Sequence, residues 1–137
     1  MKKIRICAAL FLVILILSGC GHHDAPISPL RLVTQIDITC HYGTSLLTRH
    51  YTATDKMEQV LLYLRLLHRG LSANTNPEQI EGIHYKIVLH YFNGQQRIYH
   101  QRADKYFSEN FKPWLNIDPE QGSQLLHLLL ELPSDAV

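Results

Sequence analysis

Residues 83–94 read IHYKIVLHYFNG and combine a strand with the turn that follows it. Apolar and polar residues alternate here, which is typical of a strand with one face buried and one face in water. The inward residues are Tyr85, Ile87, Leu89 and Tyr91, and the outward ones are His84, Lys86 and His90. Asn93-Gly94 is a strong hairpin signal, so we expect a returning strand over 95–101. Loops of two and of three residues both fit, and the register of the hairpin stays open.

Two more strands are expected earlier in the chain. The alternation from Leu30 to Tyr42 places these residues on one face: Leu32, Thr34, Ile36, Ile38 and Cys40. Residues 43–45 supply a turn. Residues 46–52 then form the antiparallel partner strand, with Leu47 and Tyr51 pointing inward.

Apolar residues at intervals of three and four predict two helices. The first spans about 55–69 and begins with Asp55 and Glu58, which match a capping box. The second spans about 118–132 and begins with Asp118, an N-cap residue followed by proline. The resulting order, β-β-α-β-β-α, predicts an α+β fold. We expect an antiparallel sheet of about four strands with two helices on one face.

The first twenty residues differ from the rest of the chain. Three basic residues stand among the first five, and an uncharged apolar run from Ile6 to Leu17 follows. That run is too short for an ordinary membrane-spanning helix, and the pattern is typical of a secretory signal peptide. The next residues, Leu17-Ser18-Gly19-Cys20, resemble the lipobox of bacterial lipoproteins. A single-pass membrane anchor with a chance cysteine is the alternative.

The lipobox resemblance implies that Cys20 carries a diacylglyceryl group, with fatty-acyl chains such as palmitate, and that cleavage occurs before it. The mature part also resembles small uncharacterised lipoproteins of Gram-positive bacteria. The implied location is the cell membrane, with the chain lipid-anchored on the extracytoplasmic face of the cell envelope. We therefore expect a signal peptide over 1–19, the lipidated cysteine and a flexible tether over 20–29, and a single α+β domain over 30–137.

The charge and the cysteine content indicate which partners and which cross-links to expect. Without the signal peptide the chain has ten basic and twelve acidic residues, a net charge of −2 with histidine neutral, and no basic run. Nucleic acid is therefore not an expected partner. With Cys7 removed and Cys20 lipidated, Cys40 has no partner for an intramolecular disulfide. We expect Cys40 to be a small core residue.

Nine histidines raise the question of a metal site. His84 and His90 share a strand face, but six residues of strand separate them by roughly 20 Å, which is too far to chelate one ion. The sequence contains no H-x-x-x-H or C-x-x-C motif, no glycine-rich phosphate loop and no convergent carboxylates. It therefore predicts no metal, no cofactor and no catalytic residue.

The segment from Tyr106 to Trp114 is the one stretch with binding character, because aromatic residues are enriched at recognition surfaces. Its candidate binding residues are Tyr106, Phe107, Phe111 and Trp114. The alternative is that the bulky residues of this segment close one end of the core, which a small domain needs.

The expected function is a small binding or interaction module of unknown ligand, held at the membrane by the lipid on Cys20. Its expected partners are the membrane itself and a protein of the envelope. A small envelope enzyme with a site assembled from scattered residues and a structural envelope protein are the alternatives.

Overall fold

A computed structural model describes residues 32–74, 76–110 and 113–136. Seven strands form one antiparallel sheet in the order β2-β1-β4-β5-β6-β7-β3. The strands are β1 (Val33–Tyr42), β2 (Ser45–Tyr51), β3 (Arg69–Ser72), β4 (His84–Tyr91), β5 (Gln96–Arg102), β6 (Tyr106–Glu109) and β7 (Leu115–Ile117). The predicted signal peptide, Cys20 and the tether lie outside the described residues.

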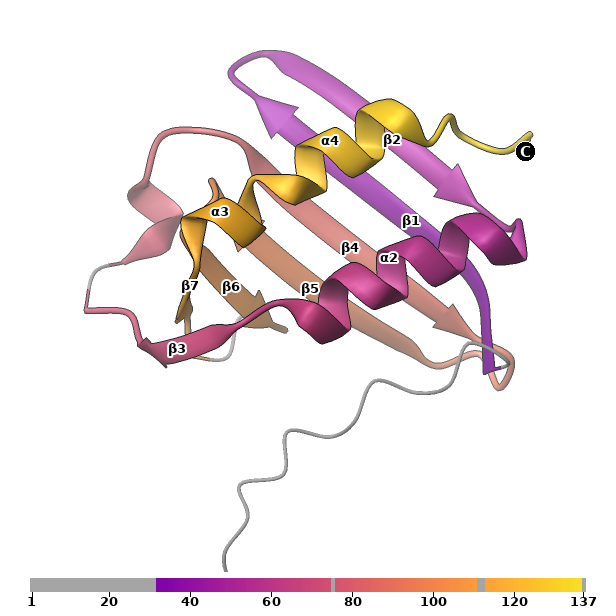
Figure 1. Ribbon diagram of the computed structural model, residues 1–137, viewed down its shortest axis with the longest axis horizontal. Helices are drawn as coiled ribbons and strands as arrows, with labels where there is room; N and C mark the ends of the chain where they lie inside the picture. Colours follow the sequence, from indigo (N-terminus) through magenta and orange to yellow (C-terminus); the bar gives the residue numbers. More distant parts are fainter. Residues whose placement is uncertain (1–31, 75, 111–112, 137) are drawn as a thin grey trace, which may run out of the picture.

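The helices lie on one face of the sheet (Figure 1). The longer two are α2 (Thr54–Leu66) and α4 (Gln124–Glu131). The short helix α3 (Pro119–Gly122) leads directly into α4, and a single 3-10 turn, η2 (Pro77–Gln79), interrupts the loop before β4. No helix of the described residues is both long and apolar enough to cross a membrane.

The expected four-stranded sheet with the order β-β-α-β-β-α is wrong. The sheet has seven strands, because β3, β6 and β7 extend it beyond the four strands that alternation reveals. These three strands are only three or four residues long. So few residues give too little alternation to identify a strand from its pattern.

The end of the first helix is one place where the prediction failed. Helix α2 ends at Leu66 instead of about Arg69. Arg69 leaves the helix because it pairs with Ile117 of β7 at the edge of the sheet. Leu71 lies in the same short strand, β3, and its side chain is 85% exposed.

The core lies between the sheet and the helices. Strands β1 and β4 contribute Ile36, Ile38, Ile87 and Leu89, and the helices contribute Leu61, Leu64, Leu125 and Leu129. The expected inward face of β1 is correct from Ile36 to Cys40, but an irregularity between Val33 and Gln35 shifts the register. As a result Val33 is buried, while Leu32 and Thr34 are exposed.

The hairpin between β4 and β5 has a three-residue loop. Tyr91 N donates to Gln95 O at 2.9 Å, so Phe92, Asn93 and Gly94 form the loop. Gly94 has φ +83°, the left-handed conformation that three-residue loops require and glycine adopts without strain. This places Gln96 opposite His90 and fixes the register of the hairpin, which the sequence left open.

The start of α2 is capped from a distant part of the chain. Asp135 Oδ2 accepts hydrogen bonds from the backbone N–H groups of Thr52 and Ala53, each at 2.8 Å. Lys56 Nζ donates to the other carboxylate oxygen. The expected capping box at Asp55 does not form, because Ala53 is the N-cap residue and the carboxylate comes from elsewhere.

Candidate functional site

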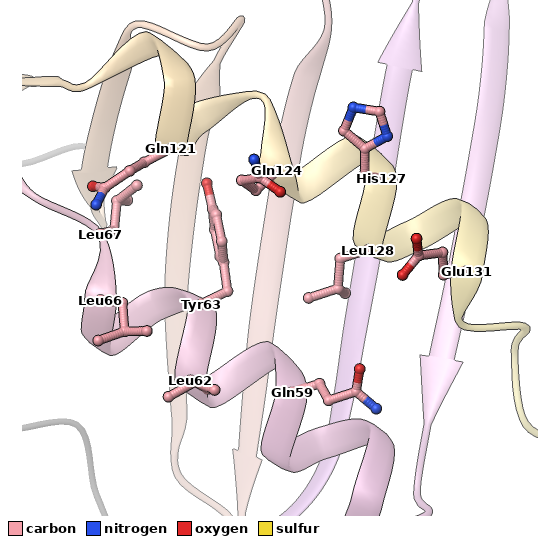
Figure 2. A pocket seen from close by; sticks show the side chains of 10 residues that line it. All are labelled: Gln59, Leu62, Tyr63, Leu66, Leu67, Gln121, Gln124, His127, Leu128 and Glu131. Atoms are coloured by element: carbon pink, nitrogen blue, oxygen red, sulfur yellow. The ribbon is translucent and has the colours of Figure 1, made fainter.

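A groove of about 420 Å³ separates α2 from α4 on the outer side of the helical layer (Figure 2). Ligand sites commonly have volumes of ~300–1,000 Å³. Its lining residues are Gln59, Leu62, Tyr63, Leu66, Leu67, Gln121, Gln124, His127, Leu128 and Glu131. Figure 2 shows Tyr63 pointing from α2 towards the α3–α4 segment and Leu128 pointing from α4 towards α2.

Helix α2 carries more leucine than its core face needs. The residues that pack on the sheet are Met57, Val60, Leu61 and Leu64. Leu62 and Leu66 lie off this stripe, one turn apart, and remain 52% and 61% exposed. The groove therefore has apolar side chains along its α2 wall that the fold itself does not bury.

A buried glutamine fixes the inner end of the groove. Gln101 of β5 is fully buried, and its Nε2 donates to the carbonyl oxygens of Ala103 and Gly122, each at 2.9 Å. Its Oε1 accepts a hydrogen bond from the Tyr63 hydroxyl. Burial raises the pKa of Tyr63, so the phenol stays a neutral donor at physiological pH. A buried amide satisfied in this way holds α2, α3 and β5 in one arrangement.

Gly122 brings α3 onto the turn after β5. A methyl group at this position would overlap the backbone of Asp104. Only glycine allows this approach, so the residue sets the distance between the end of α3 and the sheet. The groove is thus built on rigid contacts at its inner end.

The rim of the groove is polar but weakly charged. Gln121 is engaged, because its Oε1 accepts from the His68 backbone N–H at 2.7 Å. Gln59 and Gln124 are exposed, and within the described part of the chain no hydrogen bond holds their side chains. Among the described residues of the lining, Glu131 is the only one with a carboxylate. The groove therefore offers apolar surface and unoccupied amide groups.

A second polar cluster lies on the face of the sheet that the helices leave uncovered. Asp37 of β1 stands between His50 of β2 and His90 of β4, with Nδ1 of His50 and Nε2 of His90 each 2.7 Å from a carboxylate oxygen. Gln35 Nε2 donates to the same carboxylate at 2.8 Å. Burial raises the pKa of Asp37, but the hydrogen bonds from His50, Gln35 and His90 outweigh it and lower the pKa overall.

We interpret this second cluster as a contact that stabilises the sheet and not as a ligand-binding site. The three groups join three adjacent strands, and the carboxylate is already occupied by its neighbours. Among the described residues, no group of three or more His, Cys, Asp or Glu side chains is arranged to hold a metal ion.

The predicted binding residues do not form one site. Phe107 is buried in the core and stacks on Tyr99, with ring centroids 5.5 Å apart. Tyr106 precedes it in β6 and therefore points to the opposite face of the sheet. Trp114 is half-buried beside Arg102, whose guanidinium lies 5.8 Å from the ring centroid. Phe111, like Cys20, lies outside the described residues.

Sequence reasoning missed the groove. The available signal was the pair Leu62 and Leu66, which is apolar at helical spacing but off the core stripe of its helix. The other wall depends on how α4 lies against α2, and no local pattern contains that information. Cys40, in contrast, is a buried free thiol as expected, and burial raises its pKa.

Comparison with known proteins found no match for this chain among family models, curated proteins or solved structures.

Proposed function

We propose that the chain is a lipid-anchored lipoprotein of the cell envelope whose domain binds an apolar peptide segment of a partner protein. The groove between α2 and α4 is the binding site. The observation that carries this proposal is the pair of exposed leucines, Leu62 and Leu66, on the wall of a groove with unoccupied glutamine amides.

The residue types at the start of the chain favour a lipid anchor at Cys20. Leu17-Ser18-Gly19-Cys20 provides an aliphatic residue, two small residues that let a peptidase approach the backbone, and a thiol nucleophile that accepts the lipid. The basic and apolar segments before it match an export signal.

The chemistry of the lining favours a peptide as the ligand of the groove. A peptide presents apolar side chains and, where it is not in regular structure, free backbone N–H and C=O groups. Leu62, Leu66 and Leu128 supply the apolar contacts, while the amides of Gln59 and Gln124 both donate and accept. A strongly charged ligand finds no complementary cluster here, because the lining has one carboxylate and one histidine.

The anchor is tested by Cys20→Ala in the full chain. We expect uncleaved precursor that no longer carries a fatty-acid label, whereas the parent chain is labelled and floats with membranes. Labelling of the Cys20→Ala protein to the same extent would exclude this anchor.

The groove is tested with a photo-crosslinking residue at position 66 of the full chain in its own cells, with position 71 as the control. We expect crosslinks from position 66 to map to one short apolar segment of a second protein. A synthetic peptide of that segment should then bind the full chain in detergent.

Matched variants decide whether the groove is the site of that binding. Leu62→Ser combined with Leu66→Ser should weaken peptide binding by about tenfold or more, and Leu71→Ser should leave it unchanged. Crosslinks that map to lipid or to a second copy of this chain, or equal binding by both variants, would refute the proposed site.

A further inference from the structure

We infer that the tip formed by Phe92 of the β4–β5 loop and Leu32, the residue before β1, contacts the lipid bilayer, so that the domain is oriented on the membrane as well as tethered to it. This inference rests on the proposed lipid anchor at Cys20. It adds a second contact that the anchor does not require.

The tip has an exposed aromatic side chain where loops are usually polar. Phe92 is the first residue of the loop between β4 and β5 and is 82% exposed. Leu32 lies beside it, because Phe92 N donates to Leu32 O at 2.8 Å, and is 42% exposed. Two exposed apolar side chains therefore share one corner of the domain.

This corner is also where the chain enters the domain. Leu32 is the first described residue, and eleven residues separate it from Cys20. Fully extended, that segment spans at most roughly 40 Å. Because a backbone hydrogen bond joins Phe92 to Leu32, the tip stays within the length of this segment from a lipid anchor at Cys20. This holds for every orientation of the rest of the domain. In Figure 1 the turn between β4 and β5 lies beside the start of β1, away from β3.

The chemistry around Phe92 suits the membrane–water interface. Asn93 of the loop and Gln95 and Gln96, which follow the loop, carry uncharged amides. Arg97 lines the same hollow, and its guanidinium pairs with Glu109 at 3.0 Å. Among the described residues that line this hollow there is no carboxylate, and the charge of the Glu109 carboxylate is compensated by its ion pair with Arg97. Apolar and aromatic side chains beside neutral polar groups are typical of segments that lie at the boundary of the acyl chains.

Leu71 provides the matched comparison. It is 85% exposed, as fully as Phe92, but lies in the edge strand β3, away from the entry of the chain. If exposure alone governed membrane contact, the two positions would behave alike. The inference requires that only position 92 meets lipid.

The test uses the full lipidated chain in vesicles of phosphatidylethanolamine and phosphatidylglycerol, with and without bromine on the acyl chains. Phe92→Trp and Leu71→Trp are compared with the parent, whose only tryptophan is Trp114. We expect the residue introduced at 92 to lose fluorescence in the brominated vesicles and to shift its emission to shorter wavelength. The emission added at 71 should not change.

The outcomes separate the inference from the anchor. If the protein floats with the vesicles but emission from position 92 is not quenched, the anchor stands and the oriented contact is wrong. Equal quenching at 92 and 71 also overturns it. If the parent floats no better than Cys20→Ala, the anchor fails and the inference fails with it. Thermal unfolding of both tryptophan variants at the parent's midpoint shows that the fold is intact.

Discussion

The two faces of the sheet are made by alternate residues of the same strands, yet they differ in what holds them. On the face beneath α2 and α4, Ile38 and Leu89 are completely buried among other apolar side chains. On the other face, Asp37 and His90 meet through hydrogen bonds and stay partly exposed. One face is stabilised by removing apolar surface from water, and the other by pairing polar groups that water can still reach.

Neighbouring residues of one strand therefore contribute to stability in different ways. Large-to-small changes on the covered face leave a cavity, whereas the same change on the uncovered face leaves space that water fills. Changes of charge are expected to matter more on the uncovered face, because hydrogen bonds between Asp37 and two histidines link β1, β2 and β4 there. Four experiments sharpen or break this contrast.

The largest effect is expected from Leu89→Ala, compared with Val88→Ala next to it in β4. Leu89 is fully buried and Val88 is half-buried on the uncovered face. We expect Leu89→Ala to lower the free energy of unfolding by about 2–5 kcal/mol, and Val88→Ala by about 1 kcal/mol or less. Chemical denaturation measures both, and equal losses would show that the two faces are not distinct.

Acid should lower the free energy of unfolding through His100, a buried histidine on the uncovered face of the sheet. Burial, helped by Arg102 and Lys86, lowers the pKa of His100 from 6.5 to about 4. The unfolded chain therefore binds a proton at a higher pH than the folded chain does, and stability is lost as pH falls from 6.5 towards 4. The loss from this group reaches about 3 kcal/mol.

The control for His100 is an exposed histidine. In the parent chain the free energy of unfolding should decrease as pH falls from 6.5 to 4. This decrease should be smaller in His100→Asn, and it should be unchanged in His127→Asn, whose substitution lies on α4. Urea titrations at several pH values provide the comparison. An unchanged slope in His100→Asn would show that burial does not hold this ring neutral.

A smaller effect is expected from Asp37→Asn. The carboxylate receives hydrogen bonds from His50, His90 and Gln35, and an amide cannot accept all three. We expect a loss of about 1 kcal/mol at neutral pH, where partial exposure limits the contribution. The pKa of Asp37 is lowered by folding, so this contribution is present above about pH 4 and disappears as pH falls below it. A difference that persists at low pH would contradict this account, and Thr48→Ala on the same face is the control.

The smallest effect on stability is expected from Leu62→Ser, on the outer side of α2. Its side chain is 52% exposed and is not part of the core stripe. The free energy of unfolding should change by less than about 0.5 kcal/mol. A loss comparable with that of Leu89→Ala would mean that Leu62 belongs to the core, and the groove would then have no spare apolar wall.

Sequence reasoning located the elements whose pattern is long and local. It found the alternation over 83–92, the loop at Asn93-Gly94 and the N-cap at Asp118, whose side chain accepts from Glu120 N at 3.0 Å. It missed the three short strands, because three or four residues show too little alternation, and because β3 pairs with β7, whose residues lie more than 40 positions later. Because these short strands were missed, the expected four-stranded sheet was wrong.

The groove was missed for a related reason. Its walls come from residues 59–67 and 121–131, which meet only after the sheet has brought the two helices to one face. The Gln101 side chain that fixes it looks like a surface residue in the sequence. Its burial follows from Tyr63 and Gly122, and neither lies near it in the chain.

The cap on α2 has a consequence for the order in which the chain folds. Asp135 lies 83 residues after Thr52 and 82 after Ala53, and Tyr51 binds Leu132 O at 2.8 Å. Contacts between residues so far apart close a long loop, which slows folding. The hydrogen bonds that cap the start of α2 therefore form only after the residues beyond α4 are in place. Until then the outer edge of β2 is open to pairing with another strand, because the hydrogen bond from the Asp135 backbone N–H to His50 O has not yet formed.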